Sequence, residues 1–284
     1  MSTATLTKPA PEGQRSPRPA LPESEGRIGL RANLRHIGAL ARRNALQIKQ
    51  DPESMFDVLL MPIIFTLLFT FVFGGAVAGV GKQSDYVSYL VPGLMAMMGM
   101  NVSMAVGSGV NEDFRKGVMD RFRTMPIARS SVLIAKIVVE IGRMMVAFAI
   151  LLVVGWIMGM EITTSPLAVL GAIGLSLLFG ASLMWIFILI GLTVKTAQAV
   201  QGVAMLVLMP LQFGSSIMAK PDTMPGWLQT FTDYNPMSNL ADAARGLFRT
   251  GLPIAHDVWM VLAWSVVITL VTAPVAIRKF RNKA

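Results

Sequence analysis

The most heavily charged stretch of the central part of the chain lies between two long apolar runs, at residues 111–131. It holds five Arg or Lys residues and three acidic residues. Four apolar residues recur within it at spacings of four, four and three, which predicts one stripe on a short helix: Phe114, Val118, Phe122 and Met125. Pro126 then ends or redirects this helix. Such a helix is suited to binding another protein or a membrane surface, so the chemistry expected here is recognition.

Catalytic and metal chemistry are not indicated by the other motifs. The sequence contains no cysteine, which excludes disulfides and thiolate metal sites. Its two histidines, His36 and His256, are far apart and show no metal-ligand spacing. We find no nucleophile elbow, zinc motif or Walker A motif, and the sequence GVGKQS at 79–84 lacks the residues of a phosphate loop. We therefore expect no bound cofactor or metal and no ATP hydrolysis by this chain.

The composition indicates an integral membrane protein. Of its 284 residues, 54% are hydrophobic and only 14% are charged, against about 25% charged in a typical soluble domain. Uncharged runs exceed the roughly 20 residues that a helix needs to cross the hydrocarbon. The predicted fold is all-α, with six transmembrane helices at about 56–79, 87–110, 131–160, 167–190, 198–219 and 257–277.

The region before the first span divides into two parts. Residues 1–27 are rich in Pro, Ser and Glu, which predicts a disordered cytoplasmic tail. Residues 28–50 are apolar on one side and basic on the other, with Arg35, Arg42 and Arg43 among the cations. This pattern predicts an amphipathic interfacial helix lying on membrane lipid, ahead of a transmembrane domain at 51–284.

The distribution of Lys and Arg predicts the orientation in the membrane. Nineteen lie in the two terminal regions, the 111–131 loop and the turn near Lys195, and four lie on the other side. Basic loops stay in the cytoplasm, so both termini are predicted to be cytoplasmic. The net charge of +9 is explained by this topology and by anionic lipid, without nucleic acid.

Three charged residues fall on one face of the third predicted span, at positions i, i+4 and i+7. They are Lys136, Glu140 and Arg143, so Glu140 can pair with either cation. We interpret them as ion pairs at the cytoplasmic base of the helix, since long cations can reach the interface. A proton or substrate relay is the alternative.

The segment 220–256 is too polar for a span and too apolar for a free loop. One apolar patch follows Pro225 and another follows the Asn235-Pro236 break, each at helical spacing. The pattern predicts two short helices that dip part-way into the membrane before the last span, where irregular backbone must be buried in protein or line a cavity. A surface loop with interfacial aromatic residues is the alternative.

Flexible Met and flat Phe side chains occur in three of the spans and could line a pathway for apolar compounds of different shapes. The candidates are Phe65, Phe69, Met97, Met100, Met104, Met209, Gln212 and Phe213. Core packing or lipid contact is the alternative for each one. Gln212 is the exception, because a carboxamide inside a span should face protein or a cavity.

The 111–131 loop also carries a family resemblance. The run from Asp113 through Gly117, Asp120-Arg121-Phe122-Arg123 and Pro126 to Arg129 is similar to the cytoplasmic loop of ABC-2 type permeases, most of all the daunorubicin/multidrug-resistance branch. The resemblance extends from about Leu34 to the C-terminus, and Asn235-Pro236-Met237 resembles the family's re-entrant helices. It implies that the loop is a coupling helix that touches a partner ATPase through Asp113, Phe114, Gly117, Val118, Asp120, Arg121, Phe122 and Pro126.

The same resemblance implies the assembly and the activity. Two permeases, identical or related, would join two ATPase subunits that bind ATP and Mg. The expected function is ATP-driven export of an amphipathic or lipophilic compound, such as a drug, antibiotic or lipid, across the cytoplasmic membrane of a bacterium. Export of a lipid-linked glycan and a non-transporting membrane scaffold are the alternatives.

Overall fold

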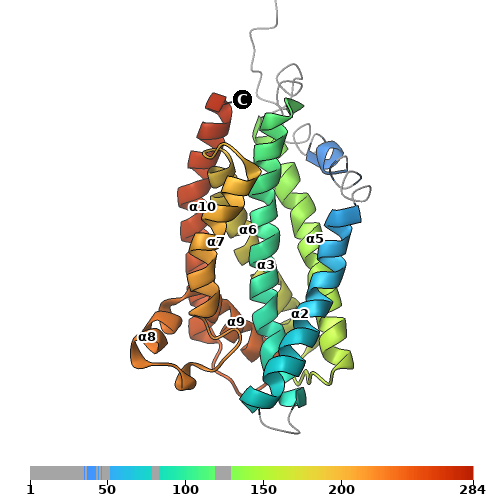
Figure 1. Cartoon of the computed structure of the whole chain (residues 1–284), viewed down its shortest axis with the longest axis vertical. Helices are drawn as coiled ribbons and strands as arrows, with labels where there is room; N and C mark the ends of the chain where they lie inside the picture. Colours follow the sequence, from blue (N-terminus) through green and yellow to red (C-terminus); the bar gives the residue numbers. More distant parts are fainter. Residues whose placement is uncertain are drawn as a thin grey trace, which may run out of the picture.

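The computed structural model describes residues 35, 37–42, 44, 46, 52–78, 83–118 and 129–283. These residues form helices and connecting turns, with no β-strand among them (Figure 1). The main elements are α2 (Pro52–Ala78), α3 (Gln83–Arg115), α5 (Arg129–Ile157), α6 (Pro166–Gly191), α7 (Ala197–Phe213), the 3₁₀ turn η1 (Pro221–Thr223), α8 (Gly226–Tyr234), α9 (Pro236–Phe248) and α10 (Ala255–Lys283). The predicted all-α class is confirmed for the described part of the chain.

Helix length and composition support a multi-pass membrane protein. Within the described residues, α3, α5, α6 and α10 are long and apolar enough to cross a membrane, and shorter apolar stretches lie in α2 and α7. The fifth predicted span was expected to be helical to residue 219, but α7 ends at Phe213. Its 17 residues give a length of about 26 Å, less than the roughly 30 Å of the hydrocarbon core. The chain continues through Gly214 as buried, irregular backbone, which hydropathy alone does not distinguish from helix.

Helix α3 stands at the centre of the bundle. It packs against α2, α5, α6, α7 and α9, while α2 and α7 lie on either side of it (Figure 1). Its closest approach is to α6, where glycines allow backbone to meet backbone. A methyl group placed on Gly107 would lie 2.4 Å from the carbonyl oxygen of Phe187, and one on Gly191 would lie 2.3 Å from the carbonyl oxygen of Gly107. Small residues that bring backbones together are typical of helix contacts in membranes.

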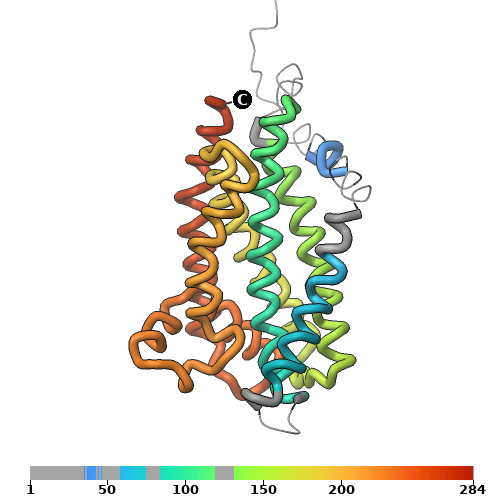
Figure 2. The backbone as a smooth tube through the Cα atoms, viewed as in Figure 1, coloured from blue at the N-terminus to red at the C-terminus, as the bar shows by residue number. Residues whose placement is uncertain are grey.

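The two short helices predicted after the fifth span are present as α8 and α9. Asn235 caps α9 through its side-chain oxygen, which accepts from the backbone N–H of Met237, and Pro236 is the first helical residue. Ten of the thirteen residues of α9 are buried, because α3, α6 and α10 surround it. The backbone N–H of Thr163, in the turn between α5 and α6, donates to the last carbonyl of α9, that of Phe248. Figure 2 shows the path of the backbone through this end of the bundle.

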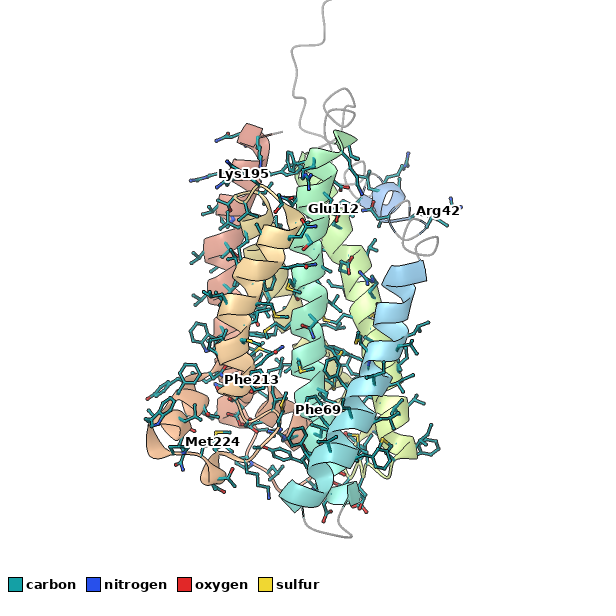
Figure 3. All side chains as sticks on the ribbon, viewed as in Figure 1. Arg42, Phe69, Glu112, Lys195, Phe213 and Met224 are labelled. Atoms are coloured by element: carbon teal, nitrogen blue, oxygen red, sulfur yellow. The ribbon has the colours of Figure 1, made fainter. Side chains whose placement is uncertain are left out.

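The two ends of the bundle differ in their side chains. The C-terminal end, which holds the end of α10, the end of α3 and the turn between α6 and α7, is rich in Lys and Arg (Figure 3). At the opposite α8–α9 end, Trp156, Trp227 and Trp259 are each more than 70% exposed. Exposed tryptophans near one end of the spans are typical of a membrane–water interface.

Candidate functional site

The last turns of α3 hold a cluster of polar contacts at the C-terminal end of the bundle. The side-chain amide of Asn111 is buried and donates to the carbonyl oxygens of Gly191 and Val194, at 3.0 and 2.8 Å. These carbonyls belong to the end of α6 and to the turn that leads into α7. Because the C-terminal carbonyls of a helix have no intrahelical partner, Asn111 supplies one and thereby ties α3 to the start of α7. No sequence pattern indicates this role, since a single Asn has no periodicity.

An ion pair joins α3 to α5 next to Asn111. The Nζ of Lys136 lies 2.6 Å from the Oδ2 of Asp113, with both side chains largely buried. The partner of Glu140 is Arg143, at 2.9 Å. The expected cluster of ion pairs is therefore present, but Lys136 is paired across helices with an acid that was assigned to the coupling helix. A recess of about 130 Å³ beside these charges is lined by residues of α3 and α5 and by Asn44.

Aromatic packing connects the end of α3 to α10. The rings of Phe114 and Phe280 meet edge to face, with centroids 5.5 Å apart. The Nζ of Lys283 lies 5.3 Å from the centroid of Phe114 and donates to the carbonyl oxygen of Leu192. This cation–π contact and the ring pair fix α10 against the last turn of α3.

Gly117 marks the point at which the chain leaves α3. Its φ of 66° lies in the left-handed region that glycine adopts at low cost, and α3 ends at Arg115. The prediction of one continuous stripe from Phe114 is wrong for this reason: Phe114 belongs to α3 and packs inward. Val118 is helical and half-buried. Four other residues assigned to the coupling helix lie outside the described residues: Asp120, Arg121, Phe122 and Pro126.

The basic residues predicted to meet lipid lie on the N-terminal helical segment. Arg35 and Arg42 are helical and exposed, and Figure 3 labels Arg42 at the C-terminal end of the bundle. Arg43 lies outside the described residues.

The predicted pathway residues divide into buried and exposed groups. Phe65 and Phe69 stack on α2, with ring centroids 5.8 Å apart. Met97 and Met100 are buried in the core between the helices, whereas Met104 and Gln212 are half-buried, and Met209 and Phe213 are exposed. The burial of Met97 and Met100 agrees with the core-packing alternative in this chain taken alone, and their predicted role in a pathway stays a prediction.

Sequence reasoning predicted Gln212 but missed other uncharged polar side chains on α3 and α7. On α3, Asn101 is half-exposed and Ser108 is buried, and neither side chain hydrogen-bonds to the described part of the chain. On α7, Gln198 and Gln201 join the predicted Gln212, and the three glutamines fall within a sector of about 60° on the helical wheel. Gln198 lines, together with Glu112 of α3, a recess of about 330 Å³; Gln198 and Gln201 are exposed and Gln212 is half-buried. Their spacing as single polar residues in apolar spans was the available signal.

Comparison with known proteins gives the family. The ABC-2 type transporter family matches residues 35–248, which include α3, α9 and the cluster around Asn111. The chain belongs to the ABC-2 type transporter family. This confirms the resemblance seen in the sequence. ABC-2 permeases are multi-pass membrane components of transporters, and ATP hydrolysis belongs to a separate ABC ATPase subunit. Permeases of this family typically assemble in pairs.

Individual relatives are drug-resistance permeases. The chain is 37% identical to the daunorubicin resistance ABC transporter permease protein DrrB1 of Streptomyces coeruleorubidus over 85% of this chain and 84% of the relative. It is 31% identical to the doxorubicin resistance ABC transporter permease protein DrrB of Mycobacterium tuberculosis over 71% and 72%. A probable multidrug ABC transporter permease of Escherichia coli, YbhR, is 25% identical over 70% of this chain and 54% of the relative. The chain is therefore an ABC-2 permease of the drug-resistance type.

Proposed function

We propose that this permease exports an amphipathic or lipophilic compound, such as a drug, an antibiotic or a lipid, out across the cytoplasmic membrane of a bacterium. The observation that carries the proposal is the similarity to daunorubicin and doxorubicin resistance permeases over most of the chain. The partner ATPase binds ATP and Mg, and this chain binds neither. Two permeases, identical or related, form the membrane part.

The ATPase acts on the loop that follows Gly117. Its coupling helix includes Asp120, Arg121, Phe122 and Pro126, and the end of α3 receives the motion. Three contacts support this role for the end of α3: Asn111 holds the turn before α7, Asp113 holds α5, and Phe114 holds α10. A displacement of this end therefore reaches three other helices directly.

The compound moves along the face of α3 between α2 and α7. The stacked Phe65 and Phe69 offer flat apolar surface, and Met209 and Phe213 are exposed on α7. Asn101 and Gln201 add hydrogen-bonding groups without charge. An uncharged carboxamide in hydrocarbon needs a polar partner, and an amphipathic compound supplies one while its apolar part contacts Phe and Met.

Both termini lie in the cytoplasm, and the α8–α9 end faces outward. The Lys and Arg residues at the C-terminal end of the bundle and the exposed tryptophans at the α8–α9 end support this orientation. Arg35, Arg42 and Arg43 then lie at the cytoplasmic lipid surface, where anionic headgroups attract them.

The test is capture of the partner ATPase by the detergent-solubilised chain. Phe122→Asp places a carboxylate on the apolar stripe of the coupling helix, and we expect capture to be lost while membrane insertion is kept. Tyr234→Asp is the matched control, because Tyr234 is an exposed aromatic residue on α8 at the opposite end. If the unchanged chain captures no ATPase, or if both variants behave alike, the coupling role fails and the scaffold alternative is favoured.

A further inference from the structure

A single buried arginine holds the α8–α9 end of the bundle together. Arg245 of α9 is only 6% exposed. Its Nε donates to the carbonyl oxygen of Tyr89 at 2.9 Å, and its Nη2 donates to the carbonyl oxygens of Ser216 and Ile217 at 2.8 and 3.1 Å. Its Nη1 donates to the Oγ of Ser216 and to the carboxylate of Asp242. The guanidinium also lies 3.6 Å from the centroid of the Tyr89 ring.

These contacts join three parts of the chain that are distant in sequence. Tyr89 belongs to α3, Arg245 belongs to α9, and Ser216 and Ile217 belong to the irregular backbone that follows α7. Carbonyl groups of irregular backbone at membrane depth must find donors within the protein. Tyr89 adds a hydrogen bond of its own, from its Oη to the carbonyl oxygen of Ser216 at 2.6 Å.

The fit around this junction is close. A methyl group on Gly93 of α3 would lie 2.7 Å from the carbonyl oxygen of Ile217 and 3.1 Å from the Nη2 of Arg245. The side chain of Ile217 is fully buried. The irregular segment is therefore pressed against α3 when Arg245 holds its carbonyls.

Helix α7 is held chiefly at its two ends. Only four of its 17 residues are buried, and two of those, Ala197 and Ala204, are small. At one end, Asn111 bonds the turn before α7. At the other end, Asn235 bonds the carbonyl oxygens of Leu211 and Gly214, and Arg245 bonds the segment that follows and joins it to α3 through Tyr89. If the far end of α7 moves away while α9 stays packed against α3, the bonds from Arg245 to Ser216 and Ile217 must break, together with the bond from Tyr89 to Ser216.

Asp242 allows Arg245 to lose its bonds to Ser216 and Ile217 without becoming an unpaired buried cation. Asp242 lies on α9 three residues before Arg245 and pairs with the guanidinium, and its side chain is 39% exposed. Because both residues are on the same helix, the ion pair stays with α9 when the carbonyls depart. Arg245 then keeps a counterion in both arrangements, so the cost of leaving a buried charge unpaired is avoided.

We propose that Arg245 is a latch, a positioning residue that keeps the α8–α9 end closed by holding the segment after α7 against α3 and that releases this segment when the transporter opens outward. The proposal rests on the proposed function in one respect, namely that α7 moves during export. The closed state itself is a property of this chain and can be tested without the ATPase.

The test uses the absence of cysteine from the natural sequence. Ile217→Cys introduces one thiol that the latch buries, while the backbone carbonyl that Arg245 binds is retained. The rate at which a membrane-impermeant maleimide labels this thiol in the full-length chain reports opening of the α8–α9 end. Val110→Cys, in a second chain, reports general loosening, because Val110 is fully buried in α3 near the opposite end.

Arg245→Gln in the Ile217→Cys chain should speed labelling by about tenfold or more, since it removes several hydrogen bonds from a charged donor. Arg245→Lys, which keeps the charge but reaches fewer carbonyls, should give a smaller increase. Arg249→Gln is the matched control, a cation that follows α9 and is outside the latch, and it should change nothing. Labelling at Val110→Cys should stay slow throughout.

Two results would overturn the latch. One is unchanged labelling of Ile217→Cys in both Arg245 variants, and the other is equal acceleration at both thiols, which would make Arg245 a general stabiliser of the bundle. Adding the ATPase and ATP to the Ile217→Cys chain should also speed its labelling. If only this last step fails, the closed state held by Arg245 stands, while its release during export and the movement of α7 in the proposed function are wrong.

Discussion

The contact between α3 and α6 should tolerate no added methyl group at Gly107. In Gly107→Ala the new carbon would lie 2.4 Å from the carbonyl oxygen of Phe187 and 2.8 Å from its carbonyl carbon. Ordinary contacts of this kind lie at about 3.4 Å or more, so the two helices must separate by about 1 Å. Both obstacles are backbone atoms, and no side chain can rotate away to relieve them.

The cost follows from the contacts that such a separation would weaken. A gap of about 1 Å forfeits up to half of the dispersion attraction between the atoms that line it. The hydrogen bonds from Ser103 to the carbonyl of Gly180 and from Asn111 to that of Gly191 cross the same interface and would lengthen. Overpacking typically costs about 1–3 kcal/mol, and we expect the upper end of this range. Gly202→Ala is the matched control, since a methyl group there meets nothing within 4 Å.

The assay is thermal unfolding of the purified chain in detergent, followed by loss of the monodisperse species. Gly107→Ala should lower the apparent midpoint by roughly 5–10 °C, at about 2–4 °C per kcal/mol. Gly202→Ala should leave it unchanged or raise it, because alanine is favoured over glycine inside a helix by up to about 1 kcal/mol. Equal midpoints for the two variants would refute the backbone contact between α3 and α6.

Two further predictions concern the C-terminal end and the polar face of α3. Lys136→Asp alone should lower the unfolding midpoint, and adding Asp113→Lys should restore most of the lost stability. The coupling free energy should be about 1–2 kcal/mol. Additive losses in this double-mutant cycle would contradict the ion pair. Under the proposed function, with daunorubicin as the transport probe, Gln201→Leu should raise the KM about fivefold through loss of one hydrogen bond and leave stability intact. Val203→Leu, on another side of α7, should not change the KM, and equal KM values for the two variants would remove Gln201 from the pathway.

Patterns along the sequence predicted elements better than they predicted contacts. Alternation of apolar and polar residues at helical spacing was enough to place α8 and α9, and the Asn235-Pro236 break between them is the cap that the structure contains. The end of α7 at Phe213 was missed because buried irregular backbone is as apolar as a span. Phe114 was placed on the wrong helix because the wheel assumes continuous helix, whereas Gly117 has a positive φ.

Contacts between different helices could rarely be predicted from this single sequence. Lys136 could be matched to Glu140 by spacing on its own helix, but its partner Asp113 lies 23 residues earlier and is brought near only by packing. Met100 was chosen for its adaptable side chain, a property that serves a core as well as a pathway, and the structure buries it. Sites built by side chains from several helices therefore require the fold, even where every helix is predicted.

The packing of the bundle separates a tightly joined part from helices that are more free to move. The glycine contacts bind α3 to α6, and α9 is enclosed by α3, α6 and α10, so these four helices form a unit that resists deformation. Helix α7 lies outside this unit, exposes most of its length, and is fastened through Asn111 at one end and Arg245 at the other. Under the proposed function, a push on the loop after Gly117 would reach α7 through the first of these fastenings. Opening of the α8–α9 end would then depend on the bonds from Arg245. A change at Arg245 should therefore separate ATP hydrolysis from transport, whereas a change at Gly107 should weaken the whole bundle.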